Sequence, residues 1–334
     1  MTTSSIGDLA QSYMQRNRNV AIKQDIARLT EELATGKKSD VRSLLAGNYA
    51  FLTDVERKTE VLSGFAIATT EAAQFTGAMQ LALGNFADQA QTLSGTLLSA
   101  GSSLSGITAD DLATEARNAL ETMIGTLNSS SAGRQLFAGN ATNRRPMADV
   151  DTILADLTAV ISGAATPADM VAQATLWFDD PGGFVTSAYQ GSNDPLTGFA
   201  VSTAESVTLD VRANDPGFFA ALRGAAVASL ATDPGRALTS QEQSELFALT
   251  GQDLLQGHSN AIGLQARVGF SEARIDTITS RNAAELTSLS MARNALLEID
   301  PFEAATRLEE AQFQLQSLYS VTVRMSQLSL VNFL

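Results

Sequence analysis

The chain has 334 residues, which is long enough to bury a sizeable core and to form two or three structural units. It contains no cysteine, and this excludes disulfides, thiolate metal sites and thiol nucleophiles. Its net charge of −14 argues against nucleic acid and anionic membranes as partners, because both would repel the chain. We therefore expect no nucleic-acid binding, and we expect no membrane insertion because no stretch of the sequence approaches a membrane span.

Charge and proline divide the chain at similar places. Residues 146–259 hold three basic and fourteen acidic residues, so −11 of the net charge lies in the middle third. No proline occurs before Pro146, six lie from there to Pro234, and only Pro301 follows. Because proline breaks helix interiors, the flanks can form long helices and the middle cannot. We expect an N-terminal helical arm with core helices over 1–145, an inserted acidic outer domain over 146–240 and a C-terminal helical arm over 241–334.

The first expected helix ends at Gly36, a residue that favours the turn after a helix. Before it, four apolar residues are spaced four, three and four apart, which places them on one seam of a helix: Ile22, Ile26, Leu29 and Leu33. The next stretch, from Asp40 to about Leu98, is rich in Ala, Leu, Glu and Gln and favours a long helix.

The middle third has short segments typical of strands. Phe184–Tyr189 and Ser206–Val211 alternate in part and contain β-branched residues. Turn sequences with Asp-Pro and Gly flank them. We predict a small α+β domain inserted between the helical arms.

The C-terminal third returns to helical periodicity. A run from about Ala261 to Glu298 carries an apolar stripe made of Val268, Ile275, Ile278, Leu286, Leu289 and Leu296. Asp300 is placed as the N-cap of a final helix, with Pro301 as its first residue. Alternating steps of four and three then put these residues on one seam: Ala304, Leu308, Ala311, Leu315, Leu318, Thr322 and Met325, with Leu328 continuing the stripe.

Two arms from opposite ends of a chain must come together to bury their stripes. The predicted fold is therefore mainly α, a long antiparallel helical coiled-coil bundle formed by both chain ends with the small α+β domain inserted. The terminal stripe also fits one helix of a monomeric bundle. Its apolar end, Leu328–Leu334, favours a surface that a partner covers. The candidate assembly-interface residues are Ile22, Ile26, Leu29, Leu33, Leu308, Ala311, Leu315, Leu318, Met325 and Leu328.

The residues that could carry chemistry are few. His258 is the only histidine, and we expect it to be a solvated residue at a helix start and not a catalytic base. Asp149 and Asp151 resemble the start of a calcium loop, but no glycine or closing glutamate follows at the required spacing. Trp177 and Phe178 fit the core of a small domain better than a sugar platform. We expect no catalytic residues, no metal site and no cofactor, and a protein that is not an enzyme.

Four stretches together resemble the flagellin superfamily and, within it, the hook-filament junction proteins of the hook-associated protein 3 family. They are Ile6–Ser12 at the opening, Leu29–Lys37 at the first helix end, Ala132–Asn140 with Thr142 and Pro146 at the passage to the middle domain, and the terminal run from Asp300 to Leu334. The resemblance covers both arms, about two thirds of the chain.

Filament flagellin is the nearest rival. The Asn-Thr opening of flagellins is absent, and Lys37–Val41 stands where flagellins usually carry an acidic, alanine-rich stretch ending in glycine. Those departures favour the junction protein and leave a divergent flagellin open. A different class, a helical coiled-coil signalling or adhesin-like protein, is the further alternative, and a metal-free hydrolase is a distant third.

The resemblance implies a structural subunit of the bacterial flagellum that joins hook to filament. Such a protein is exported without a cleaved signal peptide through the flagellar type III apparatus, guided by an export chaperone, and its location is extracellular. Its expected partners are copies of itself, the hook-side junction protein and flagellin. Interleaved helical arms fit this role, because heterologous contacts between copies generate rings or tubes.

Overall fold

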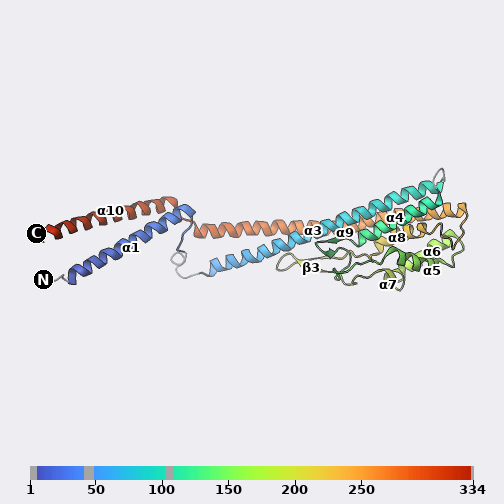
Figure 1. The fold of residues 1–334 in the computed structure, drawn as a ribbon, viewed down its shortest axis with the longest axis horizontal. Coiled ribbons are helices and arrows are strands. Elements are labelled where there is room, and N and C mark those ends of the chain that lie inside the picture. Colours follow the sequence, from blue (N-terminus) through green and yellow to red (C-terminus); the bar gives the residue numbers. More distant parts are fainter. Residues whose placement is uncertain (1–5, 41–48, 103–107, 332–334) are drawn as a thin grey trace. The chain divides into compact units, whose positions relative to one another are not determined.

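The computed structural model describes residues 6–40, 49–102 and 108–331, and long helices dominate it (Figure 1). The long helices are α1 (Ile6–Thr35), α3 (Ala50–Ser102), α4 (Ala109–Leu127), α9 (Ser240–Leu297) and α10 (Pro301–Val331). The shorter elements are β1 (Ser130–Ser131), β2 (Arg134–Gln135), α5 (Val150–Ile161), α6 (Pro167–Asp179), α7 (Phe184–Ala188), β3 (Leu196–Ala200), β4 (Ser206–Leu209), the 3₁₀ helix η1 (Pro216–Phe218) and α8 (Phe219–Ser229). This mainly α composition, with few short strands, confirms the predicted fold class.

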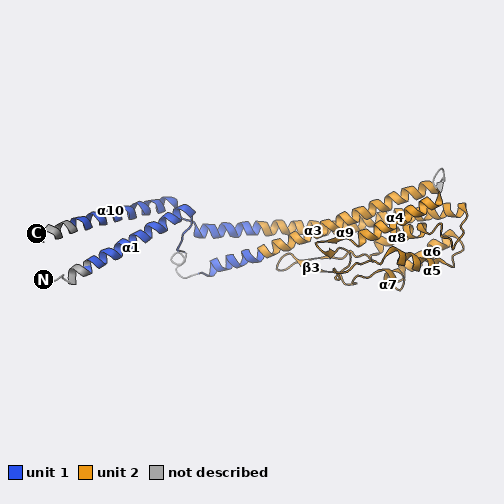
Figure 2. Cartoon of the chain, in the orientation of Figure 1, with its two compact units in different colours: residues 1–62, 284–334 blue, residues 63–283 orange. Residues whose placement is uncertain are grey.

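The chain forms two compact units, coloured separately in Figure 2. Unit 1 consists of residues 1–62 and 284–334, and it contains α1, α10 and the adjoining ends of α3 and α9. Unit 2 consists of residues 63–283. The three segments expected from the sequence, 1–145, 146–240 and 241–334, are a different division, and they stay a prediction.

In unit 2 the helices α3 and α9 run antiparallel and are bonded directly. Gln80 Nε2 donates to the carbonyl of Gln265 at 2.9 Å, and Ser94 Oγ donates to the carbonyl of Gly251 at 2.7 Å. Numbers rise along α3 as they fall along α9, so the two helices have opposite directions. Gly251 lets them approach closely, because a Cβ there would lie 2.8 Å from Leu98.

The core of unit 2 is continuous from the long helices into the short elements. One cluster of buried side chains extends from Ala72 to Ile278. Phe86 of α3 meets Phe218 edge to face with ring centroids 5.0 Å apart, and Phe178 stacks on Phe184 at 4.3 Å. Such aromatic pairs add stability beyond the area they bury. Phe178 is fully buried, as the sequence predicts for the core of this region.

Two antiparallel hairpins complete unit 2. Strand β1 pairs with β2, with Ser131 opposite Arg134, and the turn between them uses positive φ at Ala132 and Gly133. Strand β3 pairs with β4 in a register that places Leu196 opposite Leu209, with an irregularity along the ladder. Both hairpins are too short to be stable without the helices on which they pack.

Three arginines on α9 hold the segment around β4 against that helix. Arg267 donates to the Asp215 carboxylate and to the Asp210 carbonyl, each at 2.8 Å. Arg274 and Arg281 both bind the Glu205 carboxylate at 3.2 Å. The three arginines are seven residues apart, which places them on one face of the helix.

The structure corrects the strand predicted at Phe184–Tyr189, because residues 184–188 form α7. Phe184 and Ala188 are four residues apart and both buried, so the segment buries one helical face. Thr186 Oγ1 also donates to the Pro181 carbonyl at 2.8 Å, which anchors the turn before the helix. The second predicted strand is correct in part, since β4 covers Ser206–Leu209.

The predicted helix boundaries are correct at both arm ends and wrong at the start of α9. Gly36 follows α1 with φ of 70°, and the Asp300 carboxylate accepts from the amide of Phe302 at 2.9 Å to cap α10. Helix α9 begins at Ser240, well before Ala261. The long helix expected from Asp40 is observed from Ala50, and residues 41–48 lie outside the described part of the chain.

His258 is therefore not at a helix start. It lies inside α9, half-buried, and its Nδ1 is 3.1 Å from the carbonyl oxygen of Ala87 on α3. A carbonyl can only accept, so this nitrogen carries the hydrogen. The histidine links the two long helices of unit 2.

Candidate assembly interface

Helices α1 and α10 of unit 1 pack on each other and run antiparallel, and together they are called the arm pair here (Figure 1). The ammonium of Lys23 lies 5.9 Å from the ring centroid of Tyr319, which fixes the register of the pair. Antiparallel helices with this alignment bring Ile26 level with Leu315 and Leu33 level with Leu308, within one turn. The two sequence stripes thus lie at the same contact.

The described members of the predicted interface are buried to different degrees. Ile22, Leu29 and Ala311 are buried, with exposed fractions of 8%, 4% and 9%. The other described members are half-buried: Ile26, Leu33, Leu308, Leu315 and Leu318. Met325 and Leu328 fall within α10, but their side chains lie outside the described residues. The stripes therefore bury each other only in part.

A polar cluster lies on the solvent-exposed side of the contact between α1 and α10, where Tyr319 is 45% exposed. The hydroxyl of Tyr319 is bonded to the side chains of Asn19 and Lys23, and these hydrogen bonds lower the pKa of Tyr319. Because Tyr319 and Lys23 are exposed, the cluster marks how α1 and α10 are aligned and adds little stability.

A groove of about 490 Å³ runs between the two helices beside this seam. Met14, Phe313 and Val321 line it with exposed fractions of 64%, 70% and 48%. Ile22 and Leu318 are also part of its lining. Large apolar side chains gathered in an exposed groove mark a contact surface for another molecule more often than a free surface.

At the base of the arm pair, two backbone hydrogen bonds join the segment that follows α1 to the segment that links α9 with α10. The amide of Lys38 donates to the Leu297 carbonyl at 2.9 Å, and the amide of Ile299 donates to the Gly36 carbonyl at 3.2 Å. The buried carboxylate of Glu32 accepts from both the amide and the hydroxyl of Ser39 at 3.1 Å. Because these bonds join residues 36–38 to residues 297–299, they form only when the N-terminal and C-terminal segments lie together.

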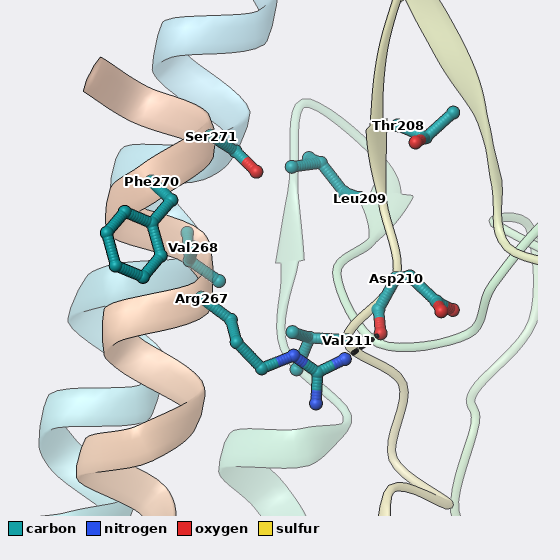
Figure 3. Close-up of a pocket in the computed structure, with 8 residues that line it drawn as sticks. All are labelled: Thr208, Leu209, Asp210, Val211, Arg267, Val268, Phe270 and Ser271. Carbon is teal, nitrogen blue, oxygen red and sulfur yellow. Dashed lines mark hydrogen bonds between the residues drawn. The ribbon is translucent and has the colours of Figure 1, made fainter. Parts of the chain in front are cut away.

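A cavity of about 260 Å³ between β4 and α9 in unit 2 does not gather side chains in an arrangement suited to catalysis (Figure 3). Its charged residues are Asp210 and Arg267, and Arg267 is already bonded to Asp215 and to the Asp210 backbone. Within the described ranges, no group of three or more His, Cys, Asp or Glu side chains could hold a metal ion. No helix in the same ranges is long and apolar enough to cross a bilayer.

Several residues of this surface were not identified from the sequence. Met14, Phe313 and Val321 lie off the stripe of each helix, so a search for a single seam passes over them. The local sequence does not predict that Glu32 is buried. Its carboxylate is enclosed because the chain turns after α1 and brings the amide of Ser39 to it. The large apolar residues outside the seam are the sequence feature that could have predicted an exposed apolar surface here.

The fold and this surface define a mainly helical protein with an exposed apolar groove on its arm pair. Residues 259–334 match the family model for the bacterial flagellin C-terminal helical region. A solved structure from Vibrio parahaemolyticus, provisionally described as a flagellar hook-associated protein, has the same fold. The match has a TM-score of 0.52 and 12% sequence identity, and it covers 73% of this chain and 95% of the other. No curated protein sequence matches the chain.

Proposed function

We propose that this protein is a non-enzymatic structural subunit of the bacterial flagellum that assembles with copies of itself through the arm pair. The observation that carries the proposal is the large apolar groove of the arm pair, in a chain whose C-terminal residues match the flagellin helical region. In this proposal the two stripes hold the arm pair together, and the exposed groove residues Met14, Phe313 and Val321 meet the neighbouring copy. The stripe residues are Ile22, Ile26, Leu29, Leu33, Leu308, Ala311, Leu315, Leu318, Met325 and Leu328.

We further propose that the subunit sits at the junction of hook and filament. The departures from flagellin at the opening and at Lys37–Val41 favour this location, and the fold shared with a described hook-associated protein agrees with it. In this role the chain is exported without a cleaved signal, with a chaperone, and contacts the hook-side junction protein and flagellin. A divergent filament flagellin is the second candidate, because the matched C-terminal model is that of flagellin itself.

Electron microscopy of cells lacking the gene, combined with analysis of the flagellin released into the medium, separates the two candidates. A junction subunit predicts hooks without attached filaments and flagellin released into the medium. A filament flagellin predicts hooks without filaments and loss of the main released flagellin. Cells that keep normal filaments would contradict both assignments.

A further inference from the structure

Charge is segregated along the arm pair. Its tip, residues 6–24 of α1 with 313–331 of α10, holds four basic residues and one acidic residue, a net charge of +3. Its base, residues 25–35 with 301–312, holds two basic and six acidic residues, a net charge of −4. The two helices are therefore close to neutral together but strongly dipolar along their length.

The charges at the tip are available to a partner. Arg16, Arg18 and Arg324 are exposed, and none of them forms an ion pair with another residue in the described ranges. Lys23 is directed to the ring of Tyr319. Three arginines without partners in so acidic a chain indicate a surface that meets negative charge elsewhere.

The charges at the base are partly used within the arm pair. Arg28 binds Asp25 at 3.0 Å and Glu32 at 3.3 Å, and Arg307 binds Glu303 at 2.5 Å. The three acidic residues left are exposed and form no ion pair among the described residues: Glu31, Glu309 and Glu310. Tip and base thus each present three unpaired charges, of opposite sign.

These charges restrict how two copies that point the same way can pack their grooves. Side by side without an offset, tip lies against tip and base against base, and like charges repel. Sliding one copy by the axial distance between Arg18 of the tip and Glu31 of the base, about 13 residues or about 20 Å, brings opposite charges together. The apolar walls of the groove, Met14 and Phe313, would then be covered by the neighbouring arm.

We propose that neighbouring copies of this chain pack their arm pairs in the same direction with an axial offset of about 20 Å, so that the basic tip of one copy lies against the acidic base of the next. This inference rests on the proposed self-assembly, and it adds the register and the residues that set it. Arg18 and Arg16 line different grooves of the arm pair, so one of them, together with Arg324, faces Glu31, Glu309 and Glu310 of a given neighbour.

Charge reversal tests the offset in polymerisation of the purified full-length chain, followed by sedimentation and electron microscopy. Reversing the tip (Arg16→Glu, Arg18→Glu, Arg324→Glu) or the base (Glu31→Lys, Glu309→Lys, Glu310→Lys) should raise the critical concentration at least about tenfold, because favourable pairs become repulsive. The variant with all six changes should assemble within about threefold of wild type. As a matched control, reversal at the exposed Glu115 and Glu245 of unit 2 should leave the critical concentration unchanged.

An equimolar mixture of the tip-reversed and base-reversed chains should assemble where each alone fails, which shows that both fold. If either reversed variant assembles as well as wild type or better, the offset is wrong, because packing without an offset places like charges together in the variant as in wild type and predicts no loss of assembly. A wild-type chain that never assembles would overturn the proposed function and the offset with it.

Disulfide formation gives a direct measure of the register, because the chain has no cysteine of its own. Copies carrying Asn17→Cys should form disulfides with copies carrying Gln312→Cys in the mixed polymer, since the offset brings these exposed positions level. Packing without an offset would instead give disulfides between two Asn17→Cys copies and would overturn the proposal.

Discussion

The ion pair between Arg223 of α8 and Asp253 of α9 is the best-formed one in unit 2. It has two parallel hydrogen bonds of 2.7 and 2.9 Å, and the side chains are only 12% and 18% exposed. Removing one partner of such a pair leaves a charge with little solvent. Arg223→Ala should therefore lower the free energy of unfolding by about 2 to 3 kcal/mol, measured by equilibrium unfolding in urea.

Arg117 provides the matched comparison for this prediction. Its side chain is 43% exposed and pairs with two exposed carboxylates, Glu121 at 3.3 Å and Asp151. An exposed pair of this kind contributes less than about 1 kcal/mol. Equal losses of stability for Arg117→Ala and Arg223→Ala would contradict the claim that the less exposed ion pair contributes more to stability.

The cap at the start of α4 should make the stability of the protein depend on pH. The hydroxyl of Thr108, followed by its backbone amide, donates to the Asp111 carboxylate and lowers the pKa of Asp111 below its ordinary value of 3.8. The cap therefore adds stability at pH values above 3.8, and this stability is lost as the pH falls through the lowered, folded-state pKa.

Thr108→Ala removes the larger of the two interactions and should raise the pKa of Asp111 towards its ordinary value. An NMR titration of the Asp111 carboxyl measures this change. Thr122→Ala in the middle of α4, whose hydroxyl bonds the Asn118 carbonyl, should leave that pKa where it is. An Asp111 pKa that does not respond to Thr108→Ala would show that the hydroxyl bond is not its cause.

At the scale of single elements, the contact between α1 and α10 makes the next prediction. A chain with Ile26→Cys and Leu315→Cys should form an intramolecular disulfide on mild oxidation of the assembled protein, because the register brings these positions level on facing seams. Ala27 and Gln316 are exposed neighbours of these positions, and the pair Ala27→Cys with Gln316→Cys should stay reduced. Non-reducing electrophoresis with mass spectrometry distinguishes the two; equal oxidation of both pairs would contradict the seam.

The arm pair should also be the least stable part of the isolated chain. Its seam has few fully buried residues, and ordering each residue costs about 1 to 2 kcal/mol in backbone entropy. A pair of helices with one narrow stripe does not readily offset that cost until neighbours cover the groove. We expect fast hydrogen exchange at Ile22–Leu33 and Leu308–Met325 in the monomer and slow exchange in α4.

Limited proteolysis should agree with the exchange data by trimming the arms and leaving a resistant core formed by unit 2. Assembly should then protect both arm segments. Strong protection of the arms in the free monomer would mean that they are folded before assembly, and the coupling of folding to assembly would be wrong.

The elements predicted well from the sequence are those with a local signal. Gly36 ended α1, and Asp300 with Pro301 started α10, because caps depend on residues within one turn. The start of α9 had a signal of the same kind that was not used. Thr239 and Glu242 bond each other's backbone groups as a capping box at Ser240.

The elements that failed depend on packing that the local sequence does not contain. Phe184–Ala188 has the sequence pattern of a strand, but in the structure it is helical and Phe184 stacks on Phe178. Leu196–Ala200 is a strand because it pairs with β4, a partner that its own sequence does not reveal. In the interface, the stripes were visible as a period of seven. The groove could not be predicted, since Met14 and Phe313 come together only when the two helices take their register.

At the scale of the whole molecule, the two units have different kinds of stability. Unit 2 has a continuous core with aromatic contacts, bonded hairpins and a largely buried ion pair. In unit 1, the arm pair has a partly buried seam, a groove and segregated charge. This division fits a subunit with a stable body and arms that complete their folding on contact with other copies.

Assembly of the purified chain, with and without its arms, tests the central claim most directly. The full-length chain and a variant lacking residues 1–35 and 301–334 are compared by sedimentation velocity and electron microscopy over a range of concentrations. Our account predicts that the full chain forms rings or tubes above a critical concentration, while the truncated chain stays monomeric with unit 2 folded. Assembly of the truncated chain at the same concentration, or a full chain that stays monomeric throughout, would contradict it.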